Sequence, residues 1–155
     1  MKMYPILIAI LLCVTSWAQE ADVTNSDAYK FIQNYYSTFA TGYDLDDRYV
    51  IISENYKAIF SDTTFTLTFD TIDKNRDLQK QIVSIDLKDV ISIEPNGLDV
   101  VEIMDYETYA IPVCWKLAFI TANETYVINI YYEVDEDVEQ TEIYKAFENL
   151  IKIKQ

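Results

Sequence analysis

The chain of 155 residues contains no histidine, and this absence excludes more chemistry than any motif adds. Without histidine there is no Ser-His-Asp or Cys-His arrangement, no imidazole ligand for a metal ion, and no side chain whose ordinary pKa lies near neutrality. The sequence also lacks a glycine-rich phosphate loop and a basic patch. The catalytic chemistries that remain are those of carboxylates and of a serine paired with a lysine.

Cysteine is almost as scarce, since Cys13 and Cys114 are its two occurrences. Cys13 lies in a segment that we expect to be removed, which leaves Cys114 without an intrachain disulfide partner. An exported chain tolerates a lone thiol when that thiol is buried. We therefore expect Cys114 to be a buried, reduced thiol on a central strand, and a zinc site of the usual nitrogen and sulfur kind is excluded.

Long apolar runs are missing except at the start of the chain. Lys2 precedes the apolar run Ile6–Val14, and Ser16-Trp17-Ala18 has the small-x-small pattern of a cleavage site. The run is nine residues long, whereas a membrane-spanning helix needs roughly 20. These features predict a signal peptide over residues 1–18, a single domain over residues 19–155, and an exported protein that is periplasmic or secreted and is not inserted in a membrane after cleavage.

Basic residues are few, with 12 lysines and arginines against 26 acidic residues and a net charge of −14. Removal of residues 1–18 takes away one lysine and no acid, so the charge of the remaining chain becomes −15. Such a surface repels phosphate backbones and anionic headgroups. Nucleic acids are therefore excluded as partners, and an unidentified protein, glycan or small molecule is expected instead.

What the chain does contain is helical periodicity near both ends. Apolar residues recur at helical spacing between Ala28 and Phe39, with Asn25 or Ser26 as the N-cap and Gly42 as the residue that ends the helix. A second helix is expected within residues 135–154, where acids crowd the start and lysines crowd the end, in the order that the helix dipole favours. Its apolar stripe consists of Ile143, Ala146, Phe147, Leu150 and Ile153.

Between these helices the alternation of polar and apolar residues predicts seven or eight antiparallel strands. Pro95-Asn96-Gly97 is expected to be a turn, Ala122 to Thr125 a short hairpin connection, and Pro112 is expected to precede its strand. The strands from Val113 and from Tyr126 look central because both of their faces carry apolar residues. The expected strands are Tyr49–Ile52, Tyr56–Phe60, Thr64–Thr71, Lys80–Leu87, Val90–Ile93, Leu98–Met104, Val113–Thr121 and Tyr126–Val134.

The segment Asp73 to Ser84 opens with the D-x-N-x-D pattern of a calcium loop. An EF-hand loop requires glycine at its sixth position and glutamate at its twelfth, and Leu78 and Ser84 occupy these positions. The flanking strands indicate a β-hairpin instead. We interpret the segment as a hairpin tip, and Asp73, Asn75 and Asp77 remain as a weak metal-site candidate; no cofactor is expected.

Taken together, the order of elements predicts an α+β fold: a strongly bent antiparallel sheet or barrel of seven or eight strands, with an N-terminal helix and a C-terminal capping helix. From Arg48 to the C-terminus this order resembles the pleckstrin-homology-like superfold. LKDVISIEPNG (Leu87–Gly97) is similar to the middle strands of such domains, and AFENLIKI (Ala146–Ile153) is similar to their closing helix. The basic loop residues by which some of these domains bind phosphoinositides are absent, so the resemblance implies no lipid site. The alternatives are a cystatin-like sheet wrapped on the first helix and a lipocalin-like barrel.

One segment combines aromatic and acidic residues outside the expected strands. Asp105, Tyr106, Glu107 and Tyr109 lie between two strands, and tyrosine suits interfaces because it offers apolar area and one hydroxyl group. These four residues are the candidate ligand-binding site, and the alternative is that both tyrosine rings fold back over the end of a barrel. The other acidic clusters are interpreted as solvated loops or a helix start: Asp44, Asp46 and Asp47; the trio around Asn75; and Glu133, Asp135, Glu136, Asp137 and Glu139.

The sequence therefore supports three hypotheses about function. The leading hypothesis is an exported, non-catalytic binding or protein-interaction domain. The first alternative is a hydrolase that uses carboxylates or a Ser/Lys pair, although nothing singles out a catalytic pair among 26 acids. The second alternative is a calcium-stabilised structural protein.

Overall fold

The computed structural model of the chain describes residues 26–45, 48–72, 77–105, 107–131 and 137–154. The expected signal peptide, residues 1–18, lies outside these ranges. The described elements, in chain order, are the N-terminal helix (residues 26–37), β1 (Thr41–Leu45), β2 (Arg48–Ser61), β3 (Thr64–Ile72), β4 (Leu78–Asp86), the short 3-10 helix η1 (Leu87–Asp89), β5 (Val90–Asp105), β6 (Glu107–Thr121), β7 (Thr125–Ile130), the 3-10 helix η2 (Val138–Gln140) and α2 (Glu142–Lys154).

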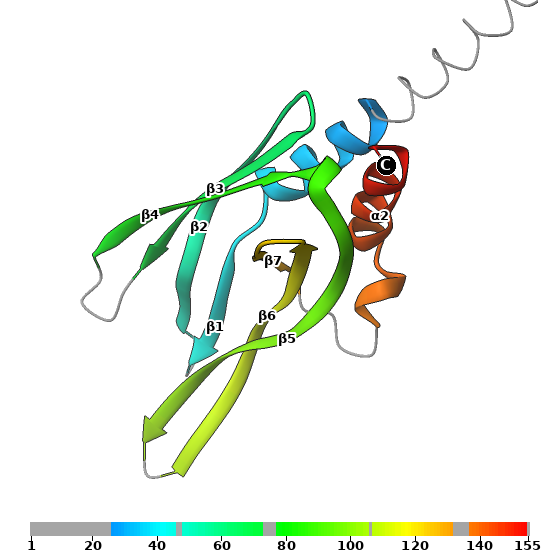
Figure 1. Cartoon of the computed structure of the whole chain (residues 1–155). Coiled ribbons are helices and arrows are strands. Elements are labelled where there is room, and N and C mark those ends of the chain that lie inside the picture. The colour runs from blue at the N-terminus through cyan, green and yellow to red at the C-terminus, as the bar shows by residue number, and fades with distance from the viewer. Residues whose placement is uncertain (1–25, 46–47, 73–76, 106, 132–136, 155) are drawn as a thin grey trace, which may run out of the picture.

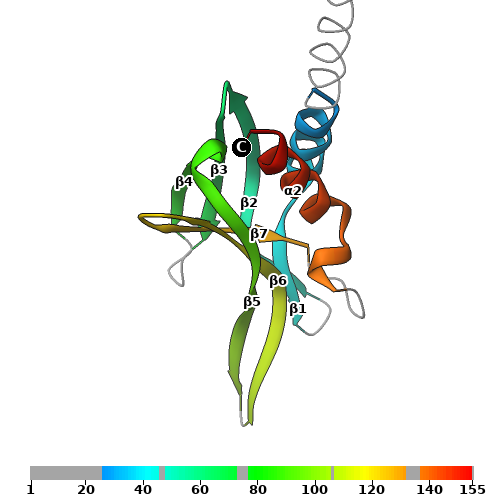
Figure 2. The ribbon, with the colours of Figure 1, turned by 45° about the vertical axis from the view of Figure 1, so that its right-hand side comes forward.

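The fold is α+β, as the sequence predicts. The strands form two antiparallel sheets, one of four strands in the order β1-β2-β3-β4 and one of three in the order β5-β6-β7. Figures 1 and 2 show the N-terminal helix and α2 side by side at one end of the molecule. The two sheets are not closed into a barrel, so the lipocalin-like alternative is wrong. The described strands also do not form the single sheet around the first helix that the cystatin-like alternative requires.

The expected hairpin before and after residues 73–77 is confirmed. β3 and β4 pair without a register shift from Thr64 and Asp86 to Ile72 and Leu78. The alternation of β3 places Phe65 and Leu67 in the core, where both are fully buried, while Thr66 between them lies on the other face.

Two of the strands are longer than expected because irregularities bend them without ending them. Asn55 has a φ of 58° in β2, and Gly97 has a φ of 85° in β5. Each residue lies at a register shift, after which pairing with the neighbouring strand resumes. The prediction that Pro95-Asn96-Gly97 is a turn is therefore wrong. A glycine with positive φ serves a bulge as well as a turn.

Gly42 does not end the first helix, which stops at residue 37; it belongs to β1, a strand that the sequence did not reveal. A Cβ atom added at Gly42 would lie 2.5 Å from the Val50 carbonyl oxygen and 2.8 Å from the Tyr49 ring. Glycine is therefore needed here because β2 approaches the backbone closely, not because the backbone turns.

The core lies between the two sheets, and α2 joins them. The fully buried ring of Phe147 makes edge-to-face contacts with Phe65 of the first sheet and Phe119 of the second, with centroid separations of 5.1 and 5.0 Å. Ile143 and Leu150 of the expected stripe are buried beside it. α2 starts later than its acidic run suggested. Its N-cap is Thr141, whose hydroxyl accepts a hydrogen bond from the Tyr144 amide at 3.3 Å.

The N-terminal helix is attached through its tyrosines. Tyr36 is fully buried and donates a hydrogen bond to the Asn129 carbonyl oxygen at 2.8 Å. The Tyr35 hydroxyl accepts one from the Tyr131 amide at 2.7 Å. These bonds link the helix to the end of β7, so the helix is an integral part of the fold. The far end of the β5–β6 hairpin extends away from the other strands and the helices (Figure 1).

Candidate functional site

The candidate site residues Asp105, Glu107 and Tyr109 lie at the tip of the β5–β6 hairpin. Asp105 is the last residue of β5, Glu107 is the first of β6, and the two are paired directly across the tip. Tyr109 is paired with Ile103. Tyr106 lies outside the described residues. The segment is therefore not a loop between separated strands, as the sequence suggested, but the end of one long hairpin.

We expected this strand to begin at Val113, directly after Pro112, so the expected strand was shorter than β6. Pro112 instead lies inside β6, opposite Val100 and at a register shift. Proline is tolerated at such a position because a bulge leaves a backbone N–H without a ladder partner in any case.

The outer part of this hairpin is a ribbon of only two strands. β6 pairs with β7 from Ile120 to Trp115, and beyond Trp115 its sheet partner is β5 alone. We call this part the arm; it consists of residues 98–105 and 107–114. β1 lies beside β6. Figures 1 and 2 both show the arm extending away from the sheets and helices.

The arm carries negative charge only. Its charged residues are Asp99, Glu102, Asp105 and Glu107, and it contains no lysine or arginine. Asp99 forms an ion pair with Lys116 at 3.2 Å, next to the root of the arm. Glu102 is exposed. The outer arm is therefore an acidic ribbon whose nearest described ion pair lies at its base.

Exposed apolar side chains accompany these acids. Leu98 and Val100 of β5 are 38% and 45% exposed. Tyr49 and Val50 of β2 are 61% and 37% exposed. They belong to the other sheet, whose strand β1 lies beside β6. Leu78, Ile82 and Ile91, on β4 and at the start of β5, are more exposed still, at 63%, 65% and 63%, so exposure alone does not single out this surface.

Cys114 lies at the root of the arm and is buried, as expected, on the middle strand of its sheet. Burial, assisted by the Asp99 carboxylate, raises the pKa of Cys114 from 9.0 to about 12. The thiol therefore stays protonated at neutral pH and is a poor nucleophile.

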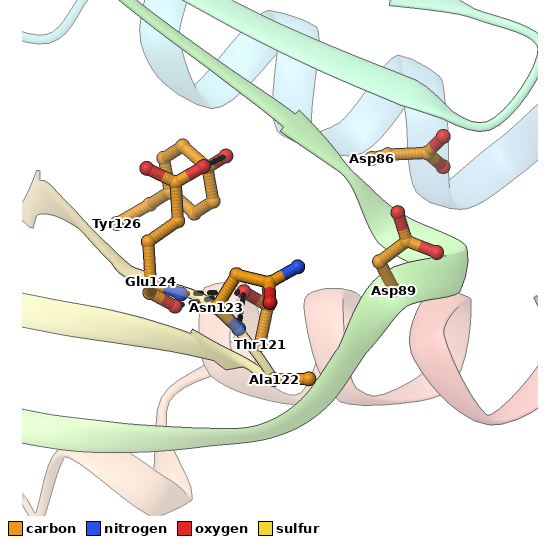
Figure 3. Close-up of a pocket in the computed structure, with 7 residues that line it drawn as sticks. All are labelled: Asp86, Asp89, Thr121, Ala122, Asn123, Glu124 and Tyr126. Carbon is orange, nitrogen blue, oxygen red and sulfur yellow. Dashed lines mark hydrogen bonds between the residues drawn. The ribbon is translucent and has the colours of Figure 1, made fainter.

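A second feature is a pocket that the sequence did not reveal (Figure 3). It lies between η1 and the β6–β7 turn and has a volume of about 290 Å³. Asp86 and Asp89 border it on the η1 side, and Glu124 and Tyr126 border it on the turn side. These two sides are distant in sequence, so no local pattern could have indicated that they meet. The remaining lining residues are Thr121, Ala122 and Asn123.

Local hydrogen bonds account for the electrostatics of this pocket. The Thr63 hydroxyl and the Lys88 ammonium group, whose Nζ lies 2.9 Å from Asp86 Oδ2, lower the pKa of Asp86. The Tyr126 hydroxyl donates a hydrogen bond to Glu124, and this bond raises the pKa of Tyr126. Asp86 is therefore ionised at neutral pH and cannot act as a general acid, which requires a raised pKa.

The Thr121 hydroxyl closes the turn that forms one wall of the pocket. It donates to the Glu124 carbonyl oxygen at 2.8 Å and accepts from the Asn123 and Glu124 amides at 3.3 and 3.1 Å. These bonds explain the geometry of the turn, which matches the short connection expected from Ala122 to Thr125. What the pocket can do chemically is accept hydrogen bonds from a cationic group.

Ser53 is the buried serine of the described residues, and it bears on the Ser/Lys alternative. Its hydroxyl group forms hydrogen bonds with the hydroxyl groups of Thr41 and of Tyr56, the latter at 2.8 Å. Asn129 donates to Tyr56 at 3.1 Å and continues the chain of bonds. Burial raises the pKa of Tyr56. Ser53 is thus bonded to other hydroxyl groups and not to a lysine, and the cluster supports the packing of β1 against β2.

In the part of the chain that the structure describes, no group of three or more carboxylates or thiols is arranged to hold a metal ion. Of the candidate trio, Asp77 is exposed, and Asp73 and Asn75 lie outside the described residues. Among the described helices, none is long and apolar enough to cross a membrane.

Comparison of the chain with protein-family models, with curated proteins and with solved structures finds no match. The pleckstrin-homology-like resemblance therefore stays a prediction.

Proposed function

We propose that this protein is an exported, non-catalytic binding domain that contacts its partner through the arm. The observation that carries the proposal is the two-stranded ribbon itself. It extends beyond the end of β7, carries exposed Leu98 and Val100, and places Asp105 and Glu107 at its tip. A two-stranded hairpin is marginally stable alone in water, so a long one that projects from a folded body is well suited to contact another molecule.

The chemistry of the described residues supports binding over catalysis. Cys114 is buried with a raised pKa, Asp86 has a lowered pKa, and Ser53 is bonded to other hydroxyl groups. A hydrolase needs an accessible nucleophile or a carboxylic acid with a raised pKa, and these residues offer neither.

A test by affinity requires the partner first. Chemical cross-linking of the protein in envelope and culture fractions, followed by mass spectrometry, would identify it. The affinity of that partner would then be measured for the wild type and for Tyr106→Ala/Tyr109→Ala. Aromatic residues carry much of the energy of an interface, so we expect a loss of at least about 2 kcal/mol, or about 30-fold.

A matched variant, Tyr126→Phe/Glu124→Gln, alters the pocket of Figure 3 and leaves the arm intact. We expect its affinity to stay within about twofold of the wild type, since that pocket lies outside the proposed interface. Circular dichroism would confirm that both variants are folded. A folded Tyr106→Ala/Tyr109→Ala variant with unchanged affinity would remove the arm tip from the binding site.

A further inference from the structure

A bulge interrupts β5 at Asn96 and Gly97, directly before the first residue of the arm. The pairing of β5 with β6 passes from Pro95 to Leu98 and skips the two residues between them. Asn96 and Gly97 therefore lie outside the regular pairing of the two strands. Both residues are exposed to solvent.

Gly97 leaves its own backbone nitrogen accessible. A Cβ atom built at this residue would have no heavy atom within 4 Å apart from those of its chain neighbours, and glycine has no side chain of its own to obstruct the nitrogen. This nitrogen and the side-chain carbon Cγ of Asn96 are placed by the covalent chain so that they can close a five-membered ring. Among the asparagines of the sequence, Asn96 alone precedes a glycine.

Two other exposed asparagines lack this combination. Asn123 precedes Glu124, whose backbone nitrogen donates a hydrogen bond to the Thr121 hydroxyl at 3.1 Å (Figure 3). The side-chain amide of Asn55 donates a hydrogen bond to Asp70 Oδ2 at 3.1 Å, and a tyrosine follows it in the chain. The fold therefore holds one of the two reacting groups in each case, the backbone nitrogen in the first and the side-chain amide in the second.

We propose that Asn96 is a site of spontaneous deamidation. The backbone nitrogen of Gly97 loses its proton and attacks Cγ of Asn96; the Cγ–Nδ2 bond breaks, and Nδ2 leaves with a proton as ammonia. Water then opens the succinimide ring that has formed. Attack of water at Cγ gives aspartate. Attack at the main-chain carbonyl carbon gives isoaspartate, in which the main chain runs through Cγ.

The product changes the base of the arm in two ways. Each deamidated copy carries one more negative charge, which lies on β5 between Glu94 and Asp99. Isoaspartate also lengthens the backbone by a carbon atom at the bulge, where the register of β5 already shifts. We therefore expect the arm to leave the sheet at a different angle in the isoaspartate form. The modification needs no partner, so the inference does not depend on the proposed function.

The full protein would be incubated in its folded state at neutral and at mildly alkaline pH, and then digested for peptide mass spectrometry. We expect Asn96 to deamidate at least about tenfold faster than Asn123 or Asn55, because glycine alone leaves the attacking nitrogen unobstructed. The rate should rise with hydroxide concentration, since that nitrogen must lose its proton. Fragmentation of the peptide would distinguish isoaspartate from aspartate.

Two variants and an unfolded control assign the result. Asn96→Gln has a longer side chain that closes a larger ring more slowly, and Gly97→Asn places a Cβ atom beside the attacking nitrogen. We expect each variant to lower the rate at position 96 at least about tenfold, and circular dichroism would confirm that both are folded. The rate at Asn96 in the folded wild type should also lie within about tenfold of its rate in guanidinium, because the bulge leaves this segment outside the regular pairing.

Three results would each overturn the inference. The first is an equal rate at Asn96, Asn123 and Asn55 in the folded protein. The second is deamidation of Asn96 in guanidinium but not in the folded protein, which would show that the fold protects it. The third is an unchanged rate at position 96 in a folded Gly97→Asn variant, which would show that the nitrogen of Gly97 is not the attacking group.

Discussion

Burial changes the chemistry of individual side chains around the root of the arm. The thiol of Cys114 and the phenols of Tyr36 and Tyr56 are buried, and burial is the largest cause of the raised pKa of each. Because ionisation of any of them would place an anion in an apolar setting, the folded state holds their protons more firmly than the unfolded chain does. This part of the molecule is therefore a source of pH-dependent stability and not of nucleophiles.

A loss of stability in alkali follows from these shifts. The pKa of Cys114 is 9.0 in its unperturbed state and about 12 in the fold, so its contribution is fully present below pH 9 and is lost as the pH rises toward 12. Tyr36 and Tyr56 add the same dependence above pH 10. Urea unfolding at about pH 7, 9, 10 and 11 should show a falling free energy of unfolding, with a shallower fall for Cys114→Ala. Identical slopes for the two proteins would contradict the assigned role of the thiol.

The two glycines are needed for different reasons, so their substitutions should differ in cost. Gly42→Ala places a Cβ atom against the fixed Val50 carbonyl oxygen and should lower the free energy of unfolding by about 1–3 kcal/mol. Gly97 has open space around it and a φ of 85°, which side chains adopt only with strain, although asparagine adopts positive φ more readily than most residues. Gly97→Asn should therefore cost less than about 1 kcal/mol. Chemical denaturation would measure both, and an equal cost would show that the close approach at Gly42 does not constrain the fold.

At the scale of elements, strand type was predictable and strand limits were not. The alternation around Phe65 and Ile85 predicted the β3–β4 hairpin because one face of each strand is buried there. β1 was missed because Gly42 looks like the end of a helix. β5 was divided because Gly97 looks like a turn, although the same backbone conformation serves a bulge. Local patterns report conformation at a residue, and tertiary pairing decides whether the strand continues.

Helix α2 should be a critical element because Phe147 contacts both sheets. Phe147→Ala removes a fully buried ring and should lower the free energy of unfolding by about 3–5 kcal/mol. Ile82→Ala, at a position that is 65% exposed on β4, should change it by about 0.5 kcal/mol or less. Urea denaturation of both variants would decide the point, and a small loss at Phe147 would mean that the sheets pack together without α2.

On the scale of the whole molecule, charge and topology together define where binding is expected. The acidic composition, known from the sequence, favours basic partners over nucleic acids and anionic membranes. The candidate residues Asp105, Glu107 and Tyr109 were also identified from the sequence, but their place on a two-stranded arm required the strand pairing. The pocket beside η1 was not predictable, since Asp89 and Glu124 meet only through the arrangement of the strands.

The central claim, that the arm is the surface that contacts the partner, can be tested in the producing cells even before that partner is identified. A photo-crosslinking amino acid would be placed at Glu102 on the arm and, in a matched protein, at Asp89 beside the pocket; both positions are exposed and acidic. After irradiation, the protein would be recovered from the cells and from the culture medium and analysed by denaturing gel and mass spectrometry. We predict a discrete adduct with one partner protein from position 102 and none from position 89. Adducts from position 89 alone, or equally from both positions, would contradict the account.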